Sequence, residues 1–106
     1  MRLSHVRVRS YRRAGRVVPL EAKGLRAGTV ILKPGAIMDW HSTRAREELL
    51  IALDGRAYVE ARSSRRISRI ALDAGQCLFL PAQTLHRVLN RSTARVRYIY
   101  VTATVK

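Results

Sequence analysis

Two segments of this chain, 35–55 and 75–90, contain His41, Glu48 and His86, three residues whose side chains can bind a transition metal and which strands could bring together. Imidazole nitrogens and carboxylate oxygens are ligands for iron, zinc, manganese, nickel and cobalt. Two histidines and one carboxylate on one side of an ion leave positions open for water, oxygen or a substrate, as in many non-haem iron enzymes. The same set binds zinc with one open position, where the metal lowers the pKa of a bound water. These side chains predict one divalent transition metal (Fe, Zn, Mn or Ni) without selecting among them.

Glycine, proline and polar residues are regularly spaced around these ligands in two segments, 35–55 and 75–90. The first segment has Gly35, five residues, His41, one residue, Thr43, four residues, Glu48, six residues and Gly55. The second has Gly75, five residues, Pro81, one residue, Gln83, two residues, His86, three residues and Asn90. This spacing resembles the two signature motifs of the cupin family.

In that family the first motif supplies two histidines and a glutamate, and the second motif supplies one histidine. The resemblance therefore implies that His41, Glu48 and His86 are the metal ligands. Two positions depart from the family pattern. Thr43 stands where the second histidine would be, and Gln83 stands where the second motif usually has glycine, which alters the turn before His86.

Short apolar runs separated by glycine and turn residues predict an all-β chain, with no helical period of useful length. The predicted strands lie at 6–9, 16–20, 28–33, 37–43, 48–53, 56–61, 67–72, 76–80, 85–89 and 95–102. Many short strands at regular spacing favour an antiparallel barrel or jelly roll. The resemblance implies the same fold, a double-stranded β-helix.

The dipeptide Asp54-Gly55 predicts a two-residue hairpin between segments 48–53 and 56–61, because a type I′ turn needs positive φ at both central residues. Alternation then turns one face of this hairpin into the barrel: Glu48, Leu50, Ala52, Ala57, Val59 and Ala61. The opposite face carries Leu49, Ile51, Leu53, Arg56, Tyr58 and Glu60. Its apolar members, Leu49, Ile51, Leu53 and Tyr58, would be exposed on a lone barrel, so we expect a homodimer.

Several polar residues lie near the predicted ligands. Asp39 shares the parity of His41 on a regular strand, so it is a candidate carboxylate behind the ligand or a general base. The hydroxyl of Thr43 is a poor metal ligand and is a candidate to hydrogen-bond a metal-bound water or a substrate. With Asp39 it forms the predicted catalytic pair.

Four further residues are predicted to contact the substrate: Phe79, Gln83, Arg44 and Arg46. The first two lie close to the second motif and would line the mouth of the cavity. The two arginines lie between His41 and Glu48 and would attract an anionic substrate. The plainer alternative for these arginines is a solvated loop.

A chain of 106 residues can bury a single core, so residues 1–106 are expected to form one domain. No apolar run approaches the roughly 18 residues that span a bilayer, and residues 1–13 lack the apolar centre of a signal peptide. We therefore expect a soluble, cytoplasmic protein with no membrane partner. The lone Cys77 cannot form an intrachain disulfide and is expected in the core, whereas His5 is expected at the surface of the first strand.

The chain has 21 lysines and arginines against 7 acidic residues, a net charge of +14. Such an excess of positive charge makes nucleic acid a candidate partner. The arginines are nevertheless spread from Arg2 to Arg97, and aromatic residues that would stack on single strands are few. We expect salt-sensitive, non-specific adsorption to polyanions and no specific nucleic-acid site.

Together these features predict a metal-binding protein, and more specifically an enzyme that acts on a small polar or anionic metabolite. The resemblance implies oxygenase, isomerase, lyase or cyclase chemistry, and the two-histidine, one-carboxylate set places an oxidoreductase of the dioxygenase kind slightly ahead. Two alternatives stay open. One is a non-catalytic binding or sensor module for a small molecule, favoured by Thr43; the other is a nucleic-acid accessory protein, favoured by net charge.

Overall fold

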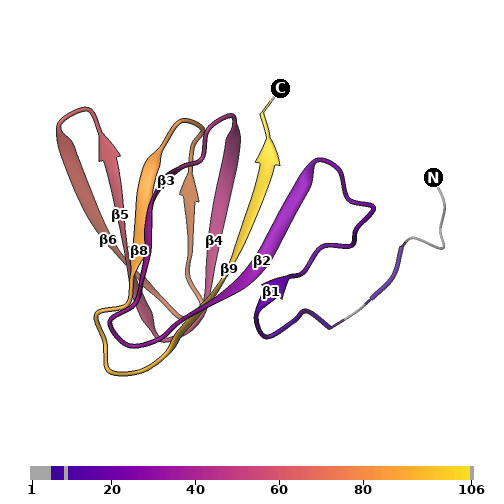
Figure 1. Cartoon of the computed structure of the whole chain (residues 1–106), viewed down its shortest axis with the longest axis horizontal. Helices are drawn as coiled ribbons and strands as arrows, with labels where there is room; N and C mark the ends of the chain where they lie inside the picture. Colours follow the sequence, from indigo (N-terminus) through magenta and orange to yellow (C-terminus); the bar gives the residue numbers. More distant parts are fainter. Residues whose placement is uncertain (1–5, 9, 106) are drawn as a thin grey trace.

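The computed structural model describes residues 6–8 and 10–105, so His5 and Arg9 lie outside the described residues. The strands are β1 (Gly15–Arg16), β2 (Leu25–Leu32), β3 (Ile37–Ser42), β4 (Arg46–Asp54), β5 (Arg56–Ser63), β6 (Arg66–Asp73), β7 (Cys77–Leu80), β8 (Leu85–Leu89) and β9 (Val96–Thr104). They form two antiparallel sheets, ordered β1-β2-β9-β4-β7 and β3-β8-β5-β6 (Figure 1). The predicted all-β, antiparallel architecture is confirmed. Among the described residues no helix is long and apolar enough to cross a membrane.

Strands β2 to β9 correspond to the predicted segments, with shifts of a few residues at their ends. The N-terminal predictions were wrong in detail. Residues 6–8 are not in a strand, and segment 16–20 contributes only its first residue, to the short β1. Among the described residues these segments join a sheet only at Arg16, through β1, and alternation alone does not place a segment in a sheet.

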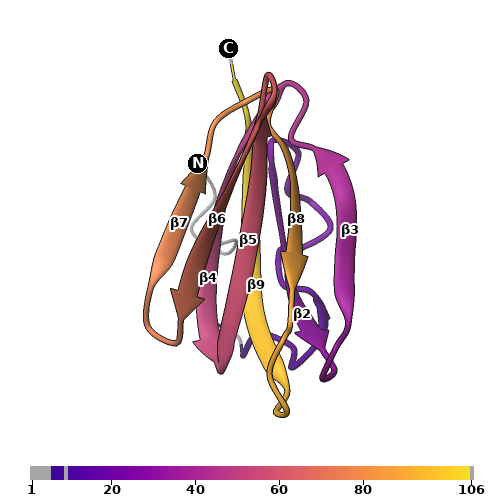
Figure 2. The same ribbon diagram turned by 90° about the vertical axis from the view of Figure 1, so that its left-hand side faces the viewer.

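The two sheets pack face to face and enclose the core between them (Figure 2). Strands that alternate apolar with polar residues bury one face each, which is the main source of stability here. The buried cluster takes residues from both sheets: Leu32, Leu50, Ala52, Ala57, Val59, Leu72, Leu80, Val88, Val96 and Tyr98. The predicted inward face of segments 48–53 and 56–61 is therefore confirmed, with only Ala61 left half-buried.

The predicted pairing of β4 with β5 was wrong. Strand β4 pairs with β7 and β9, whereas β5 pairs with β6 and β8, so the chain passes from one sheet to the other at Gly55. Only Gly55 has a positive φ there, 78°, and a type I′ hairpin needs two such residues. A Cβ at Gly55 would lie 2.8 Å from the carbonyl oxygen of Arg95, so glycine also fits a close backbone approach.

This crossing separates the residues that were predicted to form one apolar outer face. Leu49 and Ile51 lie on the outside of the five-stranded sheet, whereas Tyr58 lies on the outside of the other sheet, beneath the guanidinium of Arg69. Register extends the first face with apolar neighbours on both sides of β4: Cys77, Phe79, Ile99 and Val101. Cys77 is exposed on this face, which corrects the prediction that it belongs to the core.

We expect two copies of the chain to associate through this outer face of the five-stranded sheet. A highly basic chain repels its own copies, so a face whose centre carries no charge is the one suited to self-association. Ile51→Lys should shift a dimer towards monomer, because it buries an unpaired charge at the contact. Light scattering at high micromolar concentration measures this, with Tyr58→Lys on the opposite sheet as the control. A parent protein that is monomeric at that concentration contradicts the expectation.

The outer face of the four-stranded sheet is organised around Glu60. Its carboxylate accepts hydrogen bonds from Arg69 and Arg87, each with a contact of 2.6 Å, and its side chain is only 7% exposed. Arg87 also lies over the ring of Trp40, 4.8 Å from the ring centre. The two guanidinium groups hold the pKa of Glu60 below its ordinary value of 4.5, because both donate hydrogen bonds to the ionised form.

This arrangement predicts an acid-dependent loss of stability. A carboxylate whose folded-state pKa is depressed stabilises the fold above its ordinary pKa, and the contribution disappears as the pH falls through the folded-state value. Glu60→Gln should lower the urea midpoint at pH 7, and the midpoints of variant and parent should converge as the pH is lowered towards the folded-state pKa. Urea titrations over this acidic range test it. Parallel curves for the two proteins would contradict the assignment.

Candidate metal centre

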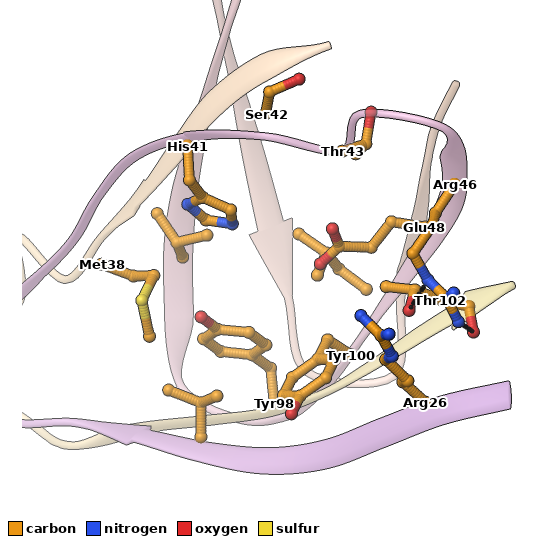
Figure 3. Close-up of a pocket in the computed structure, with 13 residues that line it drawn as sticks. Arg26, Met38, His41, Ser42, Thr43, Arg46, Glu48, Tyr98, Tyr100 and Thr102 are labelled. Carbon is orange, nitrogen blue, oxygen red and sulfur yellow. Dashed lines mark hydrogen bonds between the residues drawn. The ribbon is translucent and has the colours of Figure 1, made fainter. Parts of the chain in front are cut away.

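His41 on β3, Glu48 on β4 and His86 on β8 converge between the two sheets. One potential ligand atom from each residue lies within 4.8 Å of the others. His41 is directly opposite His86 in the β3–β8 pairing, and their ring centres are 4.2 Å apart. His86 and Glu48 are buried, whereas His41 is exposed, so the cluster opens to solvent on the side of β3. Figure 3 shows His41 and Glu48 among the residues that line the adjoining cavity. The structure thus brings together the three predicted ligands.

A bulge in β3 sets the direction of His41. The register shifts by one residue between Met38 and His41, so both residues face the inside of the sandwich, opposite the buried Val88 and His86. The shared parity predicted for Asp39 and His41 assumed a regular strand, and the bulge interrupts it. The Asp39 carboxylate instead accepts a hydrogen bond from the Trp40 amide at 2.7 Å. A direct role of that carboxylate at the centre stays a prediction.

Main-chain carbonyls orient both histidines. His41 Nδ1 lies 2.8 Å from the carbonyl oxygen of Asp39, and His86 Nδ1 lies 3.1 Å from that of Thr84. A carbonyl only accepts, so each Nδ1 carries the proton and each Nε2 of the neutral ring carries a lone pair. Desolvation by burial lowers the pKa of His86, which favours this neutral form. This is the tautomer that binds metal through Nε2.

The buried end of the site contains a polar atom without a hydrogen-bond partner, His86 Nε2. This atom lies 3.6 Å from Glu48 Oε1, too far for a hydrogen bond. Burial raises the pKa of Glu48, while the nearby His41 lowers it. Two acceptors held face to face without a donor cost free energy, and a cation bound by both removes that cost. The residues present therefore fit a divalent metal ion.

Replacing any one of the three ligands should strip the centre of metal. His41→Ala, Glu48→Ala and His86→Ala should each weaken metal binding by more than about tenfold. Replacing a residue that only hydrogen-bonds a ligand already lowers metal affinity by about that factor, and here the ligand itself is lost. Elemental analysis after dialysis against a weak chelator measures it. Glu47→Ala, at the exposed neighbour of Glu48, is the matched control. Equal metal content in all five proteins would refute the site.

Thr43 follows β3, and its hydroxyl ties that strand to the loop between β7 and β8. The Oγ1 donates to the carbonyl oxygen of Pro81 at 2.8 Å and accepts from the Thr84 amide at 3.0 Å. The side chain is buried, and in Figure 3 its oxygen points away from Glu48. The loop that it anchors carries the carbonyl of Thr84, which orients His86. Its predicted contact with a metal-bound water or substrate stays a prediction.

Thr43→Val should lower the free energy of unfolding by about 1–3 kcal/mol, because it leaves a buried donor and a buried acceptor unpaired. Metal content should not change. Thr43→Ser keeps the hydroxyl and should recover most of the stability. Chemical denaturation and elemental analysis on the same preparations measure both quantities. Loss of metal in the valine variant at unchanged stability would instead place the hydroxyl at the ion.

Three of the four predicted substrate contacts line two different cavities, and the fourth lies in an exposed loop. Arg46 lines the cavity of about 420 Å³ that contains His41 and Glu48. Phe79 and Gln83 line a separate cavity beside β7 and β6. Arg44 is exposed in the loop after β3, with a φ of 54°, and its carbonyl accepts from the Gln83 amide at 2.8 Å. The structure therefore brings only Arg46 of these four residues to the cavity of the centre.

Sequence reasoning missed the wall of this cavity formed by β2 and β9. Arg26, Tyr98 and Tyr100 line it, and the signal for the tyrosines is their shared parity with the buried Val96. Tyr100 lies over Gly28, where a Cβ would be 2.7 Å from its hydroxyl oxygen, so glycine leaves room for the ring. Burial raises the pKa of Tyr98 above its usual range, which keeps its hydroxyl protonated.

Comparison with known proteins agrees with this geometry. A sequence profile described as a cupin domain matches residues 28–102, well over half of the chain. The two-sheet fold contains a cluster of His41, Glu48 and His86, of which the last two are buried, and this cluster is a candidate metal site. The chain belongs to the cupin family. No curated protein matches its sequence at a significant level.

Solved structures share the fold at low sequence identity. The cupin domain of Schizosaccharomyces pombe Cnp3 superposes with a TM-score of 0.76 at 17% identity, over 87% of this chain and 64% of that one. An oxalate oxidase in complex with glycolate gives 0.72 at 16% identity, over 76% of this chain and 42% of that one. The plu4264 protein of Photorhabdus luminescens superposes with a TM-score of 0.72 at 16% identity, over 85% of this chain and 72% of that one. This chain thus spans less than two thirds of the first two.

Proposed function

We propose that this cupin is a metal-dependent enzyme that acts on a small polar or anionic metabolite, with oxygen-dependent oxidation as its reaction class. The observation that carries the proposal is the unpartnered Nε2 of the buried His86, held 3.6 Å from the carboxylate of Glu48. A merely structural histidine would satisfy both ring nitrogens. Here only Nδ1 is satisfied.

His41, Glu48 and His86 would hold one divalent ion, which supplies Lewis-acid or redox chemistry when bound. Three protein ligands from one side leave positions open towards the cavity. The carbonyls of Asp39 and Thr84 accept from Nδ1 of the two rings and so leave both Nε2 atoms unprotonated and available to such an ion. Tyr98 and Tyr100 form the opposite wall, where they exclude part of the water and leave a hydroxyl-bearing surface for the substrate. The oxalate oxidase of the same fold binds glycolate, a small carboxylate, and this supports a small anionic substrate.

Metal identification on protein that has never met a nickel column tests the proposal. One equivalent of iron, manganese, nickel or zinc should be found, or should be recovered after reconstitution. Bound metal stabilises the fold by mass action, and an excess of about 100-fold over Kd adds about 2.7 kcal/mol to the free energy of unfolding. The same titration on His41→Ala is the control. A protein that cannot be loaded with any of these ions would overturn the proposal of a metal-dependent enzyme and favour a metal-free binding module.

A second experiment addresses the reaction class. Oxygen uptake by the iron-loaded or manganese-loaded protein is measured with a panel of small hydroxy and oxo acids, beside Glu48→Gln. Uptake that requires both the metal and Glu48 supports an oxidase or oxygenase. Metal binding without oxygen uptake, together with turnover of the same acids in the absence of oxygen, would replace oxidation by isomerase or lyase chemistry.

A further inference from the structure

Arg26 lies in the same row of the five-stranded sheet as the metal ligand Glu48. Register pairs Arg26 on β2 with Thr102 on β9, and Thr102 with Glu48 on β4. Residues opposite each other in an antiparallel pair share a face, so Arg26 starts on the same inner face as the ligand. Two strand spacings separate their backbones by about 10 Å. Arg26 therefore borders the cavity two strands away from the centre (Figure 3).

The guanidinium of Arg26 differs from that of the neighbouring Arg46. Arg46 donates four hydrogen bonds, to Thr102 Oγ1, Thr104 Oγ1 and the carbonyl oxygens of Gly24 and Thr102. Arg26 has no side-chain hydrogen bond and no acidic partner within the part of the chain that the structure describes. Five arginines that do not line this cavity, by contrast, are paired with an acid among the described residues: Arg7, Arg56, Arg69, Arg87 and Arg97.

The charges that line the cavity leave room for an anion. Arg26 and Arg46 are positive, and Glu48 is the one carboxylate among the described lining residues. A divalent ion bound at Glu48 would neutralise that negative charge. Gly28, two residues after Arg26 on β2, has no side chain, and the ring and hydroxyl of Tyr100 lie where its Cβ would be. A guanidinium presents paired N–H donors that match the two oxygens of a carboxylate.

We propose that Arg26 binds a carboxylate of the substrate and so selects a small organic acid whose other end reaches the metal centre. This inference rests on the function proposed above and names its substrate class. Arg46 lies beside this site but is held in place by its four hydrogen bonds, so it contributes positive charge and a fixed wall. Arg26 is the specificity residue, since its donors are free to meet the ligand.

The test measures carboxylate binding by calorimetry on zinc-loaded protein at physiological salt, where surface adsorption is screened. The probes are malonate, succinate and glutarate, with succinamide as the neutral match of succinate. Arg26→Gln should weaken binding of the best acid by about tenfold or more and leave succinamide unaffected. Arg26→Lys keeps the charge without the paired donors, so its affinity for the acid should lie between those of the parent and Arg26→Gln. Arg91→Gln, at an exposed arginine outside the cavity lining, removes the same charge and should bind like the parent.

Metal content is measured in every variant, so the two proposals fail separately. Full metal in Arg26→Gln with weakened acid binding supports the inference. Equal acid affinity in Arg26→Gln and the parent overturns it, because the ion alone would then hold the carboxylate. Equal losses in Arg26→Gln and Arg91→Gln also overturn it, because net charge would then explain the binding. Failure of the parent to bind any of the three acids overturns it as well. Failure of every variant to take up metal counts against the proposed function instead, and the acid titrations of the apo protein still decide the role of Arg26.

Discussion

The arrangement of the site depends on one electrostatic constraint, the approach of His86 Nε2 to the Glu48 carboxylate between the sheets. Both atoms are hydrogen-bond acceptors, both belong to buried side chains, and no donor lies between them. Such a contact persists only where the surrounding structure holds it in place. Here the carbonyl of Thr84 fixes the ring and the core on both sides of Glu48 fixes β4. This unfavourable contact lies where a bound cation would relieve it.

Several features that look incidental serve to hold this pair. The crossing at Gly55 sends β4 and β5 into different sheets, so that Glu48 and His86 meet across the sandwich instead of along one sheet. The bulge in β3 turns His41 inward beside Met38 and brings the carbonyl of Asp39 to its ring. Thr43 joins the end of β3 to the loop that orients His86. Position 43 therefore stabilises the loop that holds a ligand in place, which is a physical role for a threonine where the family pattern has a histidine.

The sequence predicted the fold and the clustering of His41, Glu48 and His86 well, because both follow from local patterns; their role as metal ligands stays a prediction. Spacing placed His41, Glu48 and His86 in one site, and alternation correctly assigned Leu50 and Val59 to the core. Strand pairing could not be predicted in the same way, since Asp54-Gly55 is compatible with either a hairpin or a crossing between sheets and the choice depends on distant strands. The prediction that Leu49, Ile51, Leu53 and Tyr58 share one outer face was wrong for the same reason. The bulge in β3 and the row from Arg26 to Glu48 arise only from register, which no short segment specifies.

Charge balance links the cavity to the rest of this basic chain. Elsewhere arginines such as Arg69 and Arg97 are neutralised by carboxylates on neighbouring strands, and the few acidic residues are largely used in this way. The described lining of the candidate metal centre contains a single carboxylate, Glu48, and two guanidinium groups, those of Arg26 and Arg46. A divalent ion bound there, as we propose, would add further positive charge, and like charges held together in a partly enclosed space repel strongly unless an anion joins them. If the cavity binds a metal ion, its charge balance would therefore favour a negatively charged ligand, and the charge of that ligand would contribute to the site together with the metal.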